Sequence, residues 1–169
     1  KRQPEVFVSA SAIGYYGDTG DRLTDESGGP GNDFGATLCR DWEKAVSLPD
    51  SIRQLTLRIG VVLGHSGGAL QRMLLPFKLG LGGPVGNGQQ WMSWISRRDL
   101  VRLILVGLDD DRYAGVFNAV VPEPVTNRAF ASALGTALNR PAFLPLPSFV
   151  LRLLMGEMSS LLLNSQRIE

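Results

Sequence analysis

The stretch Val6-Phe7-Val8-Ser9-Ala10 decides the fold class, because β-branched and aromatic residues are followed at once by small ones. This pattern is typical of a buried parallel strand that delivers a loop at its carboxyl end. That loop, residues 14–31, contains six glycines together with aspartates, threonines and a proline. A connection of this length inside a compact domain is usually functional. We therefore expect ligand-binding residues at the carboxyl end of the strand.

The segments that follow predict a strand, a helix and a second strand. Asp33 is placed to cap a helix from residue 34 to about residue 47. The helix is indicated by apolar residues that recur every four positions, at Phe34, Leu38, Trp42 and Val46. Residues 55–64 are expected to form the second strand and residues 116–120 a third. Because such a succession forms a right-handed parallel unit, the fold class is predicted to be α/β.

The charge balance and hydropathy exclude several kinds of partner. Basic residues number 17 and acidic residues 16, and the basic ones are scattered along the chain. No patch would hold a phosphate backbone, so we expect no nucleic acid among the partners. The longest apolar runs are interrupted by Pro147, Arg152 and Glu157. No membrane span, which needs roughly 20 apolar residues, is therefore expected.

The single cysteine and the single histidine limit the chemistry further. Cys39 cannot form a disulfide within the chain, which favours a reducing, cytoplasmic compartment. With His65 as the lone histidine and Cys39 far from it in sequence, no metal site is expected. The first five residues show neither a signal-peptide pattern nor an initiator methionine, so we expect the chain to begin in the middle of a protein.

The phosphate-binding pattern Gly-x-Gly-x-x-Gly is absent. Gly80 and Gly82 have its first spacing, but Val85 stands where the third glycine belongs, and no strand precedes them. The glycines of residues 80–88 are interpreted either as a loop that lets a backbone approach a ligand or as plain turns.

Several motifs, in order, resemble one protein family. Residues 9–17, Ser-Ala-Ser-Ala-Ile-Gly-Tyr-Tyr-Gly, resemble the Ser-Ser-x-x-x-Tyr-Gly segment of extended short-chain dehydrogenases and sugar-nucleotide epimerases. Residues 58–64 look like the next strand of that family, which lines the nicotinamide. More narrowly, the chain resembles the atypical epimerase family with a small carboxy-terminal domain of unknown function. The segments that carry this narrower likeness are residues 9–17, 42–43, 67–69, 75–84 and 140–147.

The resemblance implies a partial Rossmann-like, doubly wound parallel sheet of the extended type, with a small and mostly helical carboxy-terminal substrate lobe. Residues 1–122 would be the carboxy-terminal part of an NAD(P)-binding domain, with substrate-lobe insertions around residues 65–95. Residues 123–169 would be the lobe, itself incomplete. The glycine-rich half would be missing, and NADP is expected as the cofactor rather than NAD. The apolar run at residues 143–147 predicts docking of the missing residues or of a second subunit, and so a possible homodimer.

The resemblance also exposes a departure at the catalytic position. Family members move a proton with a Tyr-x-x-x-Lys pair, whereas the matching residues 34–38 here are Phe-Gly-Ala-Thr-Leu. We expect Ser11 to hold a substrate carbonyl or hydroxyl group, and Tyr15 or Tyr16 to donate a proton. Packing or ligand stacking is the alternative role for both tyrosines.

Further residues are expected to bind the cofactor or the substrate. The predicted cofactor contacts are Ser9, Ala10, Arg58, Gly60, Val61 and Val62. The guanidinium group of Arg58 suits a carboxylate or phosphate, and pairing with a surface acid is its alternative. Trp91 and Trp94 are expected to stack on the substrate, with core packing as the alternative.

Two functions follow from these expectations. The first is an NAD(P)-dependent, epimerase-like oxidoreductase that transfers hydride on a small polar or nucleotide-sugar substrate. The second is a nucleotide-binding regulatory or scaffold protein of the same fold that is catalytically weak or inactive. The retained serine and tyrosine string favours the first, and loss of Tyr-x-x-x-Lys favours the second.

Overall fold

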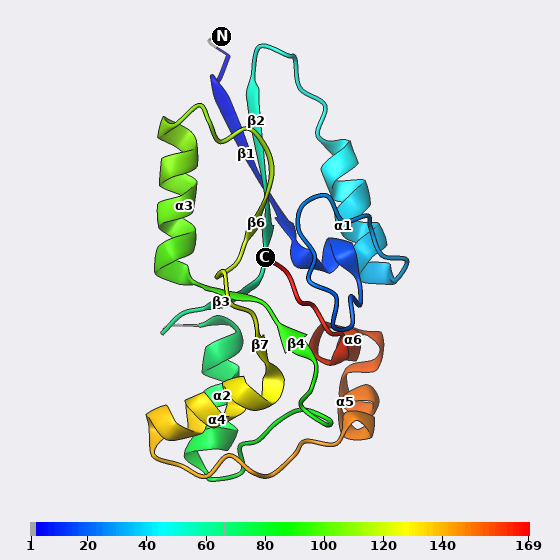
Figure 1. Ribbon diagram of the computed structural model, residues 1–169, viewed down its shortest axis with the longest axis vertical. Coiled ribbons are helices and arrows are strands. Elements are labelled where there is room, and N and C mark those ends of the chain that lie inside the picture. The colour runs from blue at the N-terminus through cyan, green and yellow to red at the C-terminus, as the bar shows by residue number, and fades with distance from the viewer. Residues whose placement is uncertain (1–2, 66) are drawn as a thin grey trace.

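A parallel sheet organises the computed structural model, which describes residues 3–65 and 67–169 but not the side chains at positions 154, 155, 157, 158 and 161. Strands β1 (Val6–Ala12), β2 (Arg53–Ile59) and β6 (Gly115–Ala119) pair in the order β1-β2-β6, all parallel. Helices α1 (Phe34–Ala45) and α3 (Arg97–Asp109) flank this sheet on its two sides (Figure 1). The predicted α/β fold class is therefore confirmed.

The two faces of the sheet differ because successive side chains of a strand point to opposite sides. Leu55 and Leu57 are buried in an apolar cluster that packs against α3. A Cβ atom at Gly107 of α3 would collide with Leu55, so the helix lies close against the strand. On the other face, Ser11, Arg58 and Asn118 are direct register partners across β1, β2 and β6. A polar row therefore crosses the sheet on the α1 side.

Helix α1 lies over this row with its apolar stripe turned outward. Asp33 caps the helix as predicted, its carboxylate accepting a hydrogen bond from the Ala36 backbone N–H at 2.8 Å. Ala36 is fully buried, whereas Phe34 and Trp42 are 74% and 60% exposed. The four-residue apolar period thus predicted the helix correctly, but the described residues leave its stripe uncovered.

The second strand is shorter than predicted, because the chain changes sheets at Gly60. After β2 ends at Ile59, β3 (Val61–Leu63) pairs with β5 (Trp94–Ser96) instead of extending the main sheet. The Gly60 N–H donates to the Ala119 carbonyl at 3.2 Å, and the Val61 N–H donates to the Ser93 carbonyl at 3.0 Å. A Cβ atom at Gly60 would lie 2.8 Å from the Ser93 oxygen. The prediction of one strand over residues 55–64 is therefore wrong.

The remaining elements form a mostly helical lobe at the lower end of the molecule (Figure 1). They are 3-10 helix η2 (Gly156–Ser159), helices α2 (Gly68–Lys78), α4 (Asn127–Leu138), α5 (Ser148–Met155) and α6 (Ser160–Leu163), and the antiparallel strands β4 (Trp91–Met92) and β7 (Val125–Thr126). In the part of the chain that the structure describes, every helix is too short or too polar to cross a membrane. After α6, residues 164–169 return toward the sheet.

Candidate functional site

The carboxyl ends of β1 and β2 lie side by side, as neighbouring parallel strands require. Ala12 and Ile59 are register partners at the last position of the pair, and the 3-10 helix η1 (Ile13–Tyr16) follows β1 directly. Ligands bind at this edge of open α/β sheets. The predicted residues Ser11, Tyr15, Tyr16 and Arg58 come together here, in contact with one another or through Glu43.

An ion pair that the sequence interpretation missed holds this cluster together. Arg58, which is 4% exposed, donates to both carboxylate oxygens of Glu43 on α1, from Nε at 2.9 Å and from Nη2 at 2.8 Å. Ser11 Oγ donates to Glu43 Oε1 at 2.7 Å. The alternative predicted for Arg58, pairing with an acid, is thus seen, although Glu43 is largely buried instead of lying on the surface.

The two tyrosines of η1 differ in what their hydroxyl groups do. Tyr16, which is 3% exposed, donates its hydroxyl to Asn118 Oδ1 at 2.8 Å and accepts from Arg58 Nη1 at 2.9 Å. Tyr15 places its ring against the guanidinium group, with Arg58 Cζ 3.4 Å from the ring centroid. The Tyr15 hydroxyl has no hydrogen-bond partner among the described residues. Tyr15 is therefore the tyrosine whose hydroxyl is available to a ligand.

Burial and hydrogen bonding together set the charges in this cluster. Burial alone would raise the pKa of Glu43, but hydrogen bonds from Arg58 and Ser11 outweigh it and hold that pKa below its ordinary value. Burial would lower the pKa of Arg58, but its hydrogen bonds to Glu43 and Tyr16 raise it above the usual range. For Tyr16, burial dominates and raises the pKa of the phenol. The cluster thus holds an ionised pair beside a neutral phenol.

The ion pair leaves Ser11 free to act as an acceptor. Because the Ser11 hydroxyl donates its one hydrogen bond to Glu43, its oxygen lone pairs remain available to a donor on a ligand. The other predicted residues of β1 are placed differently, since Ser9 is 6% exposed and Ala10 lies open to solvent.

The two predicted tryptophans also separate. Trp91 is engaged within the protein, since its Nε1 donates to Asp21 Oδ1 at 2.9 Å and the Arg167 guanidinium carbon lies 4.4 Å above its ring. Trp94 Nε1 is shielded from solvent and has no partner in the part of the chain that the structure describes. A buried donor without an acceptor is rare and calls for an explanation. A ligand that accepts a hydrogen bond from Trp94 Nε1 would explain it.

Strand β3 provides the remaining predicted cofactor contacts. Val61 is the register partner of Trp94, while Val62 packs against the apolar core. By the alternation of a strand, Val61 and Trp94 therefore face away from that core. Gly60 is required by the close approach of the Ser93 backbone, and its predicted contact with a cofactor stays a prediction, as do those of Val61 and Val62.

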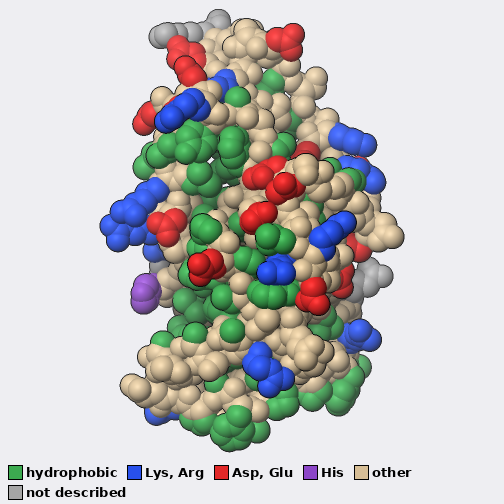
Figure 2. All heavy atoms as spheres, viewed as in Figure 1, with side chains coloured by type: hydrophobic (Ala, Val, Ile, Leu, Met, Phe, Trp, Pro, Cys, Tyr) green, Lys and Arg blue, Asp and Glu red, His purple; other side chains and the backbone are tan. Residues whose placement is uncertain are grey.

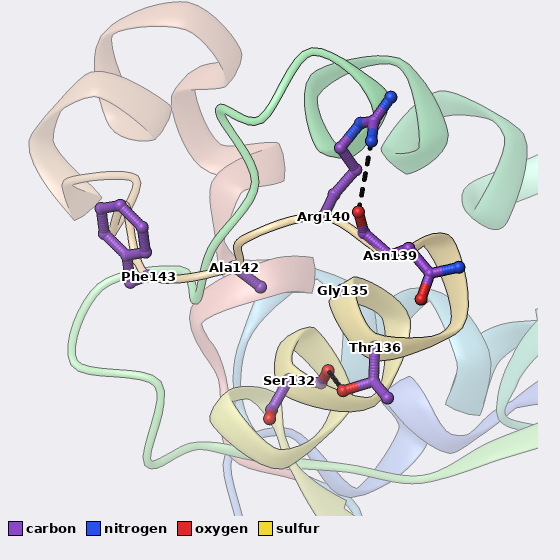
Figure 3. A pocket seen from close by; sticks show the side chains of 7 residues that line it. All are labelled: Ser132, Gly135, Thr136, Asn139, Arg140, Ala142 and Phe143. Atoms are coloured by element: carbon purple, nitrogen blue, oxygen red, sulfur yellow. Dashed lines mark hydrogen bonds between the residues drawn. The ribbon is translucent and has the colours of Figure 1, made fainter.

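Two hollows involve residues of the helical lobe. One, of about 480 Å³, lies between the last turns of α4 and the segment that follows that helix, and Figure 3 shows Arg140 and Phe143 extending from opposite ends of this segment. It includes none of the predicted residues. The other, of about 520 Å³, is lined by Asp18 and Asp21 from the loop that follows η1, and by Arg152 among others from the lobe.

On the face seen in Figure 2, acidic and basic side chains are interspersed, with neither sign forming a broad patch.

Known proteins resemble this chain over nearly its whole length. A family model described as a domain of unknown function, DUF1731, matches residues 146–169. "Epimerase family protein SDR39U1 homolog, chloroplastic" of Arabidopsis thaliana is 44% identical over 98% of this chain and 48% of its own length. The human epimerase family protein SDR39U1 (isoform 2), solved with NADPH, is 42% identical with a TM-score of 0.94, over 98% of this chain and 57% of that one.

A more distant structure agrees in fold. The nucleoside-diphosphate sugar epimerase of Corynebacterium glutamicum is 31% identical with a TM-score of 0.74, over 98% of this chain and 39% of that one. The chain thus spans about half the length of the curated relatives it matches. The family model begins at residue 146, so the predicted domain boundary after residue 122 stays a prediction. The parallel sheet, the segment of residues 9–17 and these likenesses together place the chain in the epimerase family, with the fold of extended short-chain dehydrogenases and reductases.

Proposed function

We propose that this chain forms part of an NAD(P)-dependent, epimerase-like oxidoreductase that transfers hydride at a carbinol carbon of a small polar or nucleotide-sugar substrate. The observation that carries the proposal is the gathering of Ser11, Tyr15 and Arg58 at the carboxyl ends of two neighbouring parallel strands. NADP is proposed over NAD because the human relative was solved with NADPH.

The residues present suit the nicotinamide end of such a cofactor. Val61 and Trp94 offer a half-buried apolar strand surface and a buried N–H that has no acceptor among the described residues. The sequence has no Gly-x-Gly-x-x-Gly, so these residues would contact the nicotinamide and not the pyrophosphate. When bound, the nicotinamide supplies the hydride chemistry.

The side chains of this chain would then orient the substrate and move a proton. Tyr15 receives the proton of the reacting substrate hydroxyl as hydride leaves the carbinol carbon, and it returns that proton in the reverse reaction. Ser11 Oγ, whose own hydrogen is bonded to Glu43, accepts a hydrogen bond from a neighbouring hydroxyl of the substrate. Arg58 holds the Tyr15 ring and the Tyr16 hydroxyl in place. The predicted role of Tyr16 as a proton donor stays a prediction. Its hydroxyl already donates to Asn118 and accepts from Arg58 within the protein, so Tyr15 is the tyrosine that we propose for this role.

The hollow beside Asp18 and Asp21 is the proposed seat of a polar substrate. Its carboxylates, together with the guanidinium group of Arg152, can bind hydroxyl groups and a phosphate. Its volume, about 520 Å³, lies within the usual range for small-molecule sites.

A second candidate is a nucleotide-binding regulatory protein with little or no turnover. It is favoured by Phe34 and Leu38, which occupy the places of the tyrosine and lysine of the proton relay and lie exposed on α1.

One set of experiments on the intact protein distinguishes the enzyme from the regulatory protein. Thermal shifts with NADPH and NADH measure binding, and the change in nicotinamide absorbance with candidate sugar nucleotides measures turnover. Loss of turnover in Ser11→Ala and Tyr15→Phe, with Tyr113→Phe unchanged, would support the enzyme. Tyr113 is a suitable control because it precedes β6, at the opposite end of the sheet. Stabilisation by NADPH without turnover supports the regulatory protein, and no binding of either cofactor refutes both.

Assembly and location remain proposals. The possible homodimer stays a prediction: Phe143, in the apolar run of residues 143–147 that the sequence assigned to docking, is 71% exposed, and sedimentation of Phe143→Glu would test it. A cytoplasmic location was expected from Cys39, whereas the Arabidopsis relative is named as chloroplastic, so the compartment can differ among relatives.

A further inference from the structure

The last six residues, 164–169, form an extended strap that crosses the carboxyl edge of the sheet (Figure 1). On one side the strap forms hydrogen bonds with the loop of residues 14–31. The Thr19 N–H donates to the Ser165 carbonyl at 2.8 Å, and the Thr24 N–H donates to the Arg167 carbonyl at 2.9 Å. On the other side it surrounds Ser93, which is fully buried. Ser93 Oγ lies 2.9 Å from the Gln166 carbonyl and 3.0 Å from both the N–H and the carbonyl of Ile168.

Two side chains of the strap grip the short helix that carries the tyrosines. Gln166 Nε2 donates to the carbonyl of Ile13 at 3.3 Å and to that of Gly17 at 3.2 Å, so one carboxamide joins both ends of η1. Ile168 is fully buried against Ile13 and Tyr16. The conformation of η1 is therefore set by the strap as well as by β1.

A chain of hydrogen bonds continues from the strap to the ion pair. Asn118 Nδ2 donates to the Glu169 carbonyl at 2.8 Å, which turns Asn118 Oδ1 toward the Tyr16 hydroxyl, 2.8 Å away. The same hydroxyl accepts from Arg58 Nη1. Each donor in this series has its acceptor held by the next group, so the series links the strap to the Arg58 guanidinium group.

We infer that Gln166, Ile168 and Asn118 are positioning residues, and that the strap orients Tyr15 and Arg58 for the ligand that binds at the sheet edge. The inference rests on the proposed function for the identity of that ligand, a nicotinamide dinucleotide. It also gives the end of the matched domain of unknown function a role, since residues 146–169 contain the strap.

The decisive variant is Gln166→Glu in the intact protein. It keeps the shape of the side chain but turns a carboxylate oxygen toward the Ile13 and Gly17 carbonyls, where the donor had been. We expect a shift of the Arg58 Nε–H resonance in nitrogen-15 spectra, a smaller near-ultraviolet circular dichroism signal from the tyrosine pair, and NADPH binding weakened about tenfold or more. A tenfold loss corresponds to about 1.4 kcal/mol.

The control is Arg167→Ala, which loosens the strap at Trp91 but removes no contact with η1. It should leave the Arg58 resonance and the affinity for NADPH unchanged. If Gln166→Glu does not fold, Ile168→Val takes its place, because it removes a single methylene group from the contact of the strap with Ile13 and Tyr16. It should shift the Arg58 Nε–H resonance by a smaller amount.

The outcomes separate the two proposals. If Gln166→Glu folds and leaves the Arg58 resonance and the tyrosine signal at their wild-type values, the inference is overturned. If those signals move while the wild-type protein binds neither NADPH nor NADH, the positioning role stands and the proposed function fails. If Arg167→Ala moves them equally, the strap acts by general stability and the specific role of Gln166 is refuted.

Discussion

The buried ion pair between Glu43 and Arg58 should dominate the response of this fold to substitution. The side chains of Arg58 and Glu43 are only 5% and 15% exposed, and two charge-assisted hydrogen bonds of 2.8 and 2.9 Å join them. Glu43→Gln keeps the shape of the side chain and an acceptor for Ser11, but it leaves the guanidinium charge unpaired. Breaking one side of a buried pair costs about 3–5 kcal/mol, and the partial exposure of Glu43 places our expectation near 3 kcal/mol.

A double-mutant cycle tests this reasoning through urea unfolding followed by tryptophan fluorescence. Arg58→Met fills the space of the arginine stem, so Glu43→Gln combined with Arg58→Met should cost clearly less than the sum of the single losses. Asp110→Asn serves as the control, because the Asp110–Arg112 pair lies on the surface and should contribute little to the free energy of unfolding. Additivity within about 0.5 kcal/mol would show that the buried pair is no stronger than a surface pair.

Three further outcomes follow from the site. The pKa of Glu43 is lower in the folded than in the unfolded state, so its contribution to the free energy of unfolding is complete above the unfolded value of about 4.3 and is lost as the pH falls through the folded value. On acidification, the urea midpoint of Glu43→Gln should therefore fall less than that of the wild-type protein. Trp94→Phe should weaken NADPH binding with little loss of stability, because its N–H has no partner among the described residues. Trp91→Phe loses the hydrogen bond to Asp21, so it should lower the free energy of unfolding by about 0.5–1.5 kcal/mol and leave NADPH binding unchanged. Gly60→Ala should cost about 1–3 kcal/mol in the same unfolding assay, since its methyl group would meet the Ser93 backbone; a loss below about 0.5 kcal/mol would refute that contact.

The fold could be predicted because its signals are local. The β-branched run of β1, the Asp33 cap and the four-residue apolar period of α1 each lie within one segment of sequence. The break at Gly60 could not be found in this way, because residues 55–64 contain no proline or charged break after Arg58 and only one glycine between the two strands. The change of sheet depends on the Ser93 backbone, which is distant in sequence.

The candidate site was predicted in part for the same reason. Ser11, the tyrosines and Arg58 flank strand ends, where the pattern points to ligands. Glu43 was missed because its partner lies on another element, although a carboxylate one turn beyond Cys39 on the buried side of α1 was a signal. Asn118, a polar residue within the apolar strand β6, was another, since an amide in a half-buried strand position needs hydrogen-bond partners.

The missing Tyr-x-x-x-Lys pair and the Arg58 network are connected through α1. Positions 34 and 38 turn outward as exposed Phe and Leu, while the inward side of the same helix presents Glu43 to Arg58. The cation that lies 3.4 Å from the Tyr15 ring is therefore already neutralised, and it can stabilise a developing phenolate on Tyr15 only in competition with Glu43. Stability and proton transfer thus make opposite demands on one guanidinium group. Substitution of Glu43 by glutamine, which sacrifices stability, would leave more of the Arg58 charge available to Tyr15.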